Sequence, residues 1–337
     1  MNLLAMNLAQ RRFVFFVIMA GGLLGLIAIT WFLISLTLGT GERVKAVSLV
    51  EGYTVREFAA LLDNDAYPPT VAVAADGTVY TGSFASGAIW SISADGATMT
   101  ELPNTREVIR SVSAIAVAGD GALIVVDQLD TDPRSVGGSL WRIAADGAIA
   151  PFGEITDGFS APNDLAIDAA GRVYVSDPGR NEVWRLEADG SGAQIFWVPP
   201  ALETENRRAV TGLAYDATTD SLIITDPEVN EIYRAPIAGG VGELLYQHGQ
   251  RADAPGFDGV TVTPDGTIYV AALGQNGVAR VADGELNYVV GLFRGAADVE
   301  YGASNRLYVA NFDQASLVIP IVEPQLPFAL DVIDLPQ

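Results

Sequence analysis

Residues 162–186 read PNDLAIDAAGRVYVSDPGRNEVWRL, which is a short apolar strand, a turn, a second strand and, after a polar loop, a third. Side chains alternate between the two faces along residues 173–175, as expected for a β-strand. Helical stretches between these strands are absent, so parallel β/α units are excluded. The segment predicts a small antiparallel sheet that cannot bury both of its faces alone.

Five further segments repeat this pattern on both sides of it. They are residues 69–92, 113–143, 211–235, 258–281 and 297–319. Aligned on the second strand, the equivalent residues are Tyr80, Ile124, Tyr174, Ile223, Tyr269 and Tyr308, separated by 44, 50, 49, 46 and 39 residues. Such spacing is typical of β-propeller blades, and Asp-Gly pairs such as Asp76-Gly77 supply the tight turns. We therefore predict an all-β, six-bladed β-propeller over residues 53–337.

Closing the ring removes exposed sheet edges, and two terminal segments compete to supply the missing strand of the last copy. Residues 53–62 (YTVREFAALL) stand just upstream of the first inner strand, and residues 328–335 (FALDVIDL) are the competitor. We favour the amino-terminal segment as the outer strand. Trp90, Trp141 and Trp184 recur at equivalent third-strand positions, which predicts blade-to-blade packing rather than a sugar platform.

Residues 13–38 run without a charge and are long enough to cross a bilayer as a helix. The apolar run exceeds that of a cleaved signal peptide, so we predict a single transmembrane signal anchor, preceded by a short tail at residues 1–12 and followed by a linker at residues 39–52. Gly21 and Gly25 have small-xxx-small spacing, although glycine is common in membrane helices generally.

Charge places the large domain outside the cytoplasm. Arg11 and Arg12 precede the apolar run, which mildly favours an inside amino terminus. The chain holds 19 basic and 41 acidic residues, for a net charge of −22. A chain this acidic repels the phosphate backbone of nucleic acids, so nucleic acid is excluded as a partner. It is also repelled by the anionic cytoplasmic leaflet, so an extracytoplasmic (periplasmic or extracellular) location is expected.

The catalytic inventory is small. Without cysteine, the chain has no disulfide, thiolate nucleophile or cysteine metal site. His248 is the only histidine and Lys45 the only lysine. His248 lies in the loop between the fourth and fifth copies, which we expect at the same end of the central channel, its mouth, as Asp258. It can act as a general base there. A loop histidine without a catalytic role is the commoner case.

The repeat resembles the NHL repeat, through Asp-x-x-Gly-x-Val-Tyr-Val-Ser-Asp-Pro-Gly-Arg-Asn-Glu-Val in the third copy. Pro162-Asn163-Asp164 and Phe257-Asp258-Gly259 also resemble the Pro-Asn-Gly and Pro-Asp-Gly segments of the gluconolactonase (regucalcin-like) superfamily of six-bladed propellers. The resemblance implies a divalent cation, usually Ca²⁺, in the central channel, with Asn163 and Asp258 as ligands. Asp258 and His248 are also the candidate catalytic residues, and no nucleophile is identified. The family's first-blade Glu is missing, because Tyr67-Pro68-Pro69-Thr70 stands in its place; Asp164, Asp298 and Glu300 are possible substitutes.

Other charged residues expected at the mouth have a structural interpretation as well as a functional one. Asp127, Asp177 and Asp226 end second strands, where aspartate most often caps its own turn. Arg180, Arg207 and Arg208 can clamp a carboxylate or simply pair with the abundant acids.

Three functions remain open. The favoured one is a membrane-anchored, non-catalytic propeller, a scaffold or accessory subunit, that offers its mouth to a protein partner or a small-molecule ligand. The alternative is a Ca²⁺-dependent hydrolase of lactones or esters resembling gluconolactonase. A weaker third is an enzyme resembling strictosidine synthase, which needs no metal.

Overall fold

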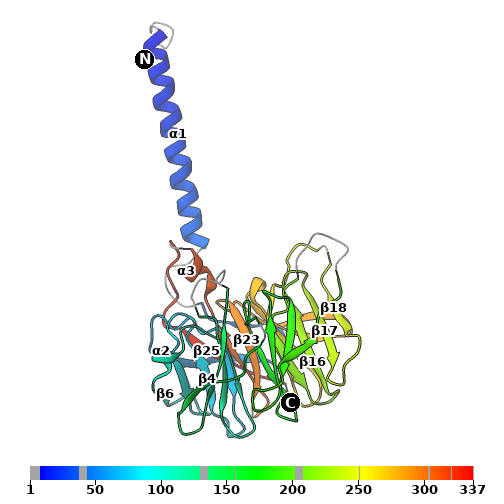
Figure 1. Ribbon diagram of the computed structural model, residues 1–337. Coiled ribbons are helices and arrows are strands. Elements are labelled where there is room, and N and C mark those ends of the chain that lie inside the picture. Colours follow the sequence, from blue (N-terminus) through cyan, green and yellow to red (C-terminus); the bar gives the residue numbers. More distant parts are fainter. Residues whose placement is uncertain are drawn as a thin grey trace.

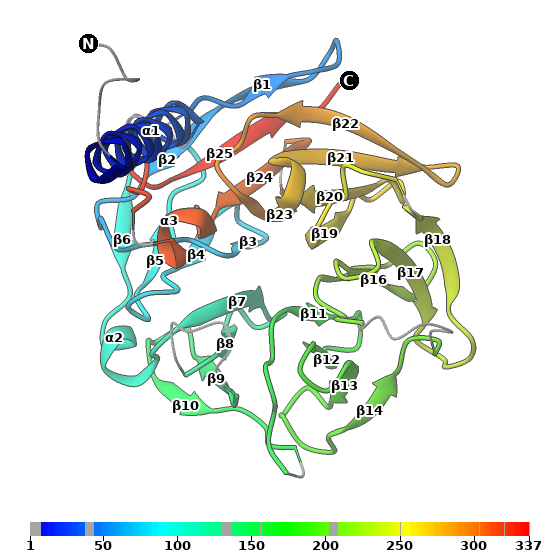
Figure 2. The same ribbon diagram turned by 90° about the horizontal axis from the view of Figure 1, so that it is seen from above.

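The computed structural model is a six-bladed β-propeller with one long amino-terminal helix standing on one of its faces (Figure 1). It describes residues 8–37, 44–129, 136–155, 157–201, 208–249, 251–302, 304–319 and 321–336. The strands of these residues form six antiparallel sheets arranged in a ring, as Figure 2 shows from above. The predicted fold class is confirmed.

The first two blades are four-stranded meanders that run outward from the channel. Blade 1 consists of β3 (Val71–Val73), β4 (Val79–Gly82), β5 (Ile89–Ile92) and β6 (Met99–Glu101), followed by the short helix α2 (Thr105–Val108). Blade 2 consists of β7 (Val112–Val117), β8 (Leu123–Asp127), β9 (Ser139–Ile143) and β10 (Ile149–Pro151).

Blades 3 and 4 repeat the same order. Blade 3 consists of β11 (Leu165–Ile167), β12 (Val173–Asp177), β13 (Glu182–Leu186) and β14 (Gln194–Trp197). Blade 4 consists of β15 (Leu213–Asp216), β16 (Ser221–Asp226), β17 (Glu231–Pro236) and β18 (Glu243–Gln247).

The last two blades recruit the amino-terminal part of the chain. Blade 5 consists of β19 (Phe257–Val262), β20 (Ile268–Ala272), the 3₁₀ turn η2 (Leu273–Gln275), β21 (Gly277–Ala282) and β22 (Glu285–Gly291), with β1 (Val47–Ser48) added outside β22. Blade 6 consists of β23 (Ala296–Gly302), β24 (Arg306–Asn311), β25 (Ala329–Asp334) and β2 (Thr54–Ala60). β1 therefore lies within residues 39–52, which we expected to be a linker.

Both segments that competed to close the ring are used. β2 is the outermost strand of blade 6, as favoured from the sequence, and it pairs with β25, which is the third strand. The amino-terminal and carboxy-terminal parts of the propeller thus share one sheet, which closes the ring without a free gap between first and last blades.

One strand prediction is wrong. The repeat predicts a third strand at the end of the sixth copy, residues 297–319, but residues Gln314–Val318 form helix α3. The third position belongs to β25, whose Ala329, Leu330, Val332 and Ile333 are fully buried, whereas Val318 is exposed. A strand between two blades needs apolar residues on both faces, and residues 329–333 meet that need while the α3 segment does not.

The hydrophobic core is divided among the blade interfaces. Six clusters of buried side chains each join one blade to the next, the last closing blade 6 onto blade 1. Trp90 and Trp184 are buried in two of these clusters and Trp141 packs against a third. The blade-to-blade role predicted for the three tryptophans is confirmed.

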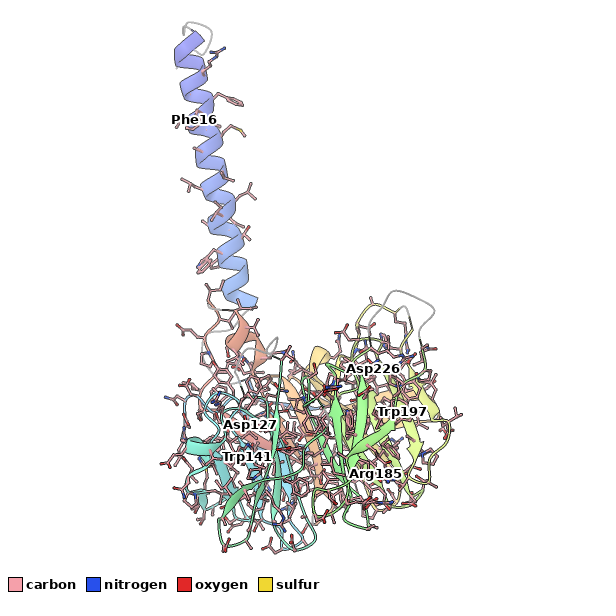
Figure 3. All side chains as sticks on the ribbon, viewed as in Figure 1. Phe16, Asp127, Trp141, Arg185, Trp197 and Asp226 are labelled. Carbon is pink, nitrogen blue, oxygen red and sulfur yellow. The ribbon has the colours of Figure 1, made fainter. Side chains whose placement is uncertain are left out.

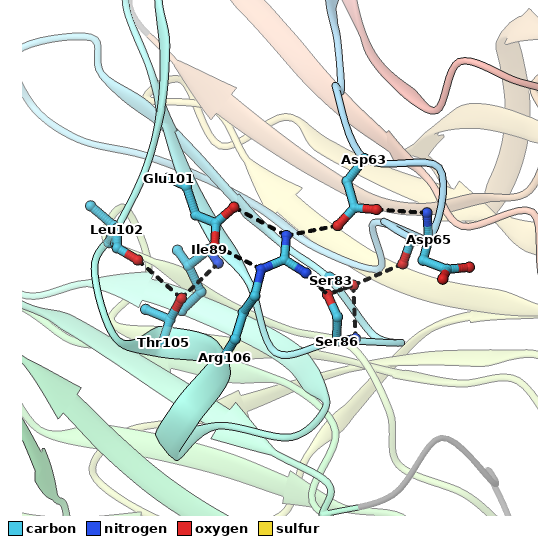
Figure 4. A network of polar contacts seen from close by, with 9 residues as sticks. All are labelled: Asp63, Asp65, Ser83, Ser86, Ile89, Glu101, Leu102, Thr105 and Arg106. Carbon is cyan, nitrogen blue, oxygen red and sulfur yellow. Dashed lines mark hydrogen bonds and ion pairs between the residues drawn. The ribbon is translucent and has the colours of Figure 1, made fainter.

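A polar network fastens the surface of blade 1 beside this core (Figure 4). The Arg106 guanidinium of α2 pairs with Asp63 and Glu101, each at 2.7 Å, and donates to the Ser86 hydroxyl at 2.9 Å. These carboxylates raise the pKa of Arg106. Because Asp63 follows β2, the network also ties the closing strand to blade 1.

Helix α1 (Leu8–Thr37) stands apart from this globular part. Its segment Val14–Phe32 is long and apolar enough to cross a membrane, and none of it is buried against the propeller. Figure 3 shows Phe16 projecting from the helix with no propeller side chain near it. In the described part of the chain, α1 is the one helix that meets this test.

Candidate functional site

A pocket of about 1060 Å³ opens at the end of the channel that faces α1 and α3. Its wall includes loops that follow second strands, such as Pro178 and Pro227, and residues of α3 such as Leu317. Four phenylalanines contribute apolar surface: Phe84, Phe257, Phe293 and Phe312. All four are buried in the clusters between blades, so they belong to the packed wall of the pocket.

Three aspartates that end second strands frame this mouth but are committed to the backbone. Asp127, Asp177 and Asp226 are fully buried, and each accepts a hydrogen bond from a backbone N–H of the loop that leads into its own blade. The donors are Ser111 for Asp127 at 3.1 Å, Ser160 for Asp177 at 2.8 Å and Ala209 for Asp226 at 3.1 Å. Each also accepts from a backbone N–H of its own turn, which confirms the capping interpretation. These donors are Leu129 for Asp127 at 2.9 Å, Arg180 for Asp177 at 3.2 Å and Glu228 for Asp226 at 3.1 Å. Figure 3 labels two of these aspartates, Asp127 and Asp226.

Asp164, Asp258 and Asp298, here called the channel carboxylates, line the pocket together. Asp164 immediately precedes β11, Asp258 lies on β19 and Asp298 on β23, so the innermost strands of three blades bring them together. An added Cβ on Gly259 would lie 2.0 Å from an Asp298 carboxylate oxygen, which shows how closely β23 approaches the strand that carries Asp258. Asn163 lines the same pocket.

Two of the channel carboxylates bridge blades. Asp164 accepts hydrogen bonds from the backbone N–H groups of Leu165 and of Leu213 in blade 4, both at 2.7 Å. Asp298 accepts from the N–H of Val71 in blade 1 at 2.9 Å and from the Thr70 hydroxyl at 3.1 Å. These carboxylates therefore satisfy edge N–H groups of neighbouring inner strands while they face the channel.

Burial dominates the electrostatics of the channel. It raises the pKa of Asp298 to about 6, and burial with the neighbouring charge of Asp298 raises the pKa of Asp164 and of Asp258 well above the ordinary range. The same two causes raise the pKa of Glu300 on β23 to about 8. Among the described residues, no ion pair neutralises any of these four groups. The channel thus holds acids without basic partners, a setting in which a bound cation stabilises the ionised forms.

The residues do not form a ready calcium site. Calcium takes about six to eight oxygen ligands. Asp164 and Asp298 already use both of their oxygens as acceptors for protein donors, and the first-blade Glu of the resemblance is absent. In the described ranges no group of three or more His, Asp or Glu side chains is arranged to hold a metal ion. No catalytic step is therefore assigned to a metal ion.

The remaining candidates lie outside the channel floor. Glu300 is not among the pocket-lining residues, and its carboxylate accepts from the Thr261 hydroxyl at 3.1 Å. His248 does not share the pocket with Asp258, contrary to expectation. It is buried just after β18, where Nδ1 is 3.0 Å from the Tyr246 hydroxyl, and Nε2 has no hydrogen-bond partner in the described part of the chain.

The mouth arginines pair with protein groups. Arg208 contacts Glu231 at 2.8 Å and Asp226 at 3.3 Å and is itself buried, while Arg180 donates to the Gly158 carbonyl at 2.7 Å. Arg207 lies outside the described residues. For Arg180 and Arg208 the structural interpretation holds, because a terminal guanidinium nitrogen of each already contacts a protein group.

Sequence reasoning missed the apolar part of the site. The four phenylalanines read as core residues, and residues 315–319 read as a strand. The available signal was the uncharged run of residues 314–322, QASLVIPIV, directly after the last repeat. In a chain so rich in acidic residues, an uncharged apolar run that is not a strand indicates a surface that differs in function from the rest.

The repeat region of the chain matches a family model. The model for the SMP-30/Gluconolactonase/LRE-like region matches residues 104–309, which is more than half of the chain. The chain belongs to this family. No curated protein sequence matches the chain significantly.

Solved structures agree with the family's fold. A gluconolactonase from Xanthomonas campestris is 18% identical, with 87% of this chain and 98% of that chain covered and a TM-score of 0.59. Catalytically inactive virginiamycin B lyase from Staphylococcus aureus with quinupristin is 15% identical, covering 84% and 99%, with a TM-score of 0.58. A chain of a nidogen/laminin complex is 15% identical, covering 75% and 97%, with a TM-score of 0.55. Enzymes and a chain of a nidogen/laminin complex thus share this architecture, and at such identity the likeness shows the fold alone.

Proposed function

We propose that this protein is a membrane-anchored, extracytoplasmic propeller that binds a small cationic ligand in its channel pocket. One observation carries the proposal: the three channel carboxylates line one pocket and none has a basic partner among the described residues. Among the described residues, Arg294 is the one arginine in the pocket wall, and it is paired with Asp313 at 2.9 Å. A ligand that brings a positive charge would supply the missing counterion.

The wall of the pocket supports an organic cation over a bare ion. Four phenylalanines and Leu317 contribute to that wall, and the volume of about 1060 Å³ exceeds what a metal ion needs. Pockets of roughly 300–1,000 Å³ with apolar walls and a few polar groups are typical of small-molecule sites. Aromatic faces also attract alkylammonium groups.

The location rests on α1 and on charge. Val14–Phe32 fits a membrane span, and Arg11 and Arg12 on its amino side favour a cytoplasmic amino terminus. Residues 46–337 carry 15 basic and 40 acidic residues, a balance of −25, which disfavours contact with an anionic cytoplasmic leaflet. A protease-protection assay on sealed membranes tests the topology, and digestion of the propeller from the cytoplasmic side would refute it.

Thermal unfolding with benzyltrimethylammonium chloride tests the ligand class, because this cation cannot lose its charge. A ligand that binds only the folded state raises Tm. We expect a higher Tm for the unchanged chain and little rise for Asp258→Asn, with Asp283→Asn, the same change on an exposed turn, as the control. Binding should strengthen as pH rises through about 6, where Asp298 ionises. An unchanged Tm, or an equal rise in Asp258→Asn, refutes the proposal.

A Ca²⁺-dependent hydrolase is the second candidate, and the family match together with Asn163 and Asp258 in one pocket favours it. The same assay separates the two. A Tm rise with CaCl₂ but not with the organic cation, abolished in both Asp258→Asn and Asn163→Ala, would favour the metal site. No Tm change in CaCl₂ or EDTA would remove it.

A further inference from the structure

An apolar rim borders the pocket on the side of α1. It consists of four exposed side chains, Leu292, Val318, Ile319 and Ile321, of which Leu292 and Val318 also line the pocket. Ile321 and Val318 are each 55% exposed. Figures 1 and 2 show α3, which carries Val318, beside the end of α1. Large aliphatic side chains gathered at one edge of a pocket require a partner that removes them from water.

The rim is held outward by a polar brace. Arg294 pairs with Asp313, the residue before α3, and donates to the Glu323 carbonyl at 3.1 Å. Asp313 also accepts from the Gln325 N–H at 2.9 Å. These bonds fix both ends of the segment that carries Val318, Ile319 and Ile321, so its apolar side chains cannot fold into the core without breaking a buried ion pair.

The chain that leaves α1 enters the propeller at this same edge. The Val44 N–H donates to the side-chain oxygen of Gln325 at 2.6 Å, and Val44 lines the pocket. Thr37, the end of α1, precedes Val44 by seven peptide units, a span of at most about 25 Å. With α1 in a bilayer, the tether keeps the rim near its surface, and the opposite face of the propeller must point away.

Charge selects the same surface. Residues 314–322 hold no charged side chain, although the propeller as a whole is strongly acidic. An acidic surface gains nothing from lipid headgroups, whereas an uncharged aliphatic segment gains by entering the interface.

We infer that the apolar rim of Leu292, Val318, Ile319 and Ile321 docks into the lipid interface of the bilayer that holds α1, with the pocket opening at the membrane surface. The inference rests on the proposed membrane anchor and adds a second contact between protein and lipid. The occupant of the rim is the lipid bilayer itself.

Depth-dependent quenching tests the docking in the full chain. Because the chain has no cysteine, Val318→Cys carries a single nitrobenzoxadiazole label. The protein is reconstituted into phosphatidylcholine vesicles with and without lipids that bear a nitroxide on the acyl chain. The control is Val241→Cys, which is 93% exposed in the hairpin between β17 and β18. That hairpin lies at the other end of blade 4 from Pro227, which lines the pocket.

The nitroxide should lower the fluorescence of the Val318 label about two-fold or more and leave the Val241 label nearly unchanged. Ile321→Cys repeats the measurement if the first variant folds poorly. Flotation of the chain with the vesicles is scored first. A chain that does not float refutes the anchor and the docking together. A chain that floats with labels at 318 and 321 unquenched, or quenched no more than the label at 241, refutes the docking and leaves the anchor standing.

Discussion

Asp298 of the last blade accepts a hydrogen bond from the backbone N–H of Val71 in the first blade at 2.9 Å. The ring is therefore closed at the channel as well as at its outer edge. The same kind of bond joins other neighbouring blades through a side-chain oxygen and an edge N–H. The pairs are Thr70 with Ile115, Asp164 with Leu213, and Thr261 with Tyr301. Inner strands thus have side-chain acceptors on edges where no further strand can pair.

Thr261→Val should destabilise the propeller through this bond. The substitution preserves shape but leaves the Tyr301 N–H, 3.0 Å from the Thr261 hydroxyl oxygen, without its acceptor. An unsatisfied buried donor costs about 1–3 kcal/mol, which urea unfolding will detect. Thr100→Val, on the exposed face of β6, is the control and should change stability by less than about 0.5 kcal/mol. Equal stability of the two variants would show that the bond contributes nothing.

Glu300→Gln should change how stability depends on pH. The folded-state pKa of Glu300 is raised to about 8, so between about 4.5 and 8 the folded chain retains a proton that the unfolded chain has released. The free energy of unfolding therefore loses a contribution from this group as pH rises through that window. Glutamine does not titrate. The free energy of unfolding of the variant, relative to that of the unchanged chain, should therefore rise between pH 5 and pH 8 by an amount on the order of 1 kcal/mol or more.

Glu285→Gln on the exposed end of β22 is the matched control for that experiment. The measured quantity is the difference in unfolding free energy between variant and unchanged chain, since other carboxylates titrate in both. A difference for Glu300→Gln that is the same at pH 5 and pH 8 contradicts the prediction.

Phe58→Ala tests the closing strand. Phe58 on β2 is buried, and its ring meets that of Tyr308 on β24 edge to face, with centroids 4.9 Å apart. Truncating a buried phenylalanine costs about 3–5 kcal/mol through lost burial and a cavity. Leu62→Ala, at a side chain that is 88% exposed, should cost less than about 0.5 kcal/mol in the same urea titration. A small effect of Phe58→Ala would mean that β2 is dispensable for closure.

The fold was predictable because one pattern recurs six times. Tyr80 and Tyr174 occupy the same position in their second strands, each opposite an alanine of the inner strand. Asp177 accepts from the Arg180 N–H of its own turn, as turn chemistry predicts. The apolar run of α3 was not predictable as a helix, because residues 315–319 have strand-like composition and only the burial of β25 decides between them. Propensity yields to tertiary context at such positions.

The site was predictable only in part. Position at an inner strand brought Asn163, Asp164, Asp258 and Asp298 into one pocket, but their roles in binding remain predictions. His248 was misplaced, because a loop histidine carries no signal that separates a blade's outer edge from its mouth. The aromatic part of the pocket wall could not be predicted. The ring centroids of Phe84 and Phe312 are 5.1 Å apart, but in the sequence these residues look like any other buried phenylalanine.

Gly259→Ala tests the approach of β23 to the strand that carries Asp258. A Cβ at this position would lie 2.0 Å from an Asp298 carboxylate oxygen and 2.8 Å from its Cα, so the backbone has to move and the channel carboxylates move with it. We expect a lower Tm and about ten-fold weaker binding of benzyltrimethylammonium, which corresponds to about 1.4 kcal/mol, because the carboxylates that contact the cation are displaced. Gly119→Ala, where nothing lies within 4 Å of the added Cβ, should leave both quantities nearly unchanged. If the two alanine variants behave alike in Tm and in binding, the two strands do not approach as described, and the convergence of Asp258 with Asp298 fails with them.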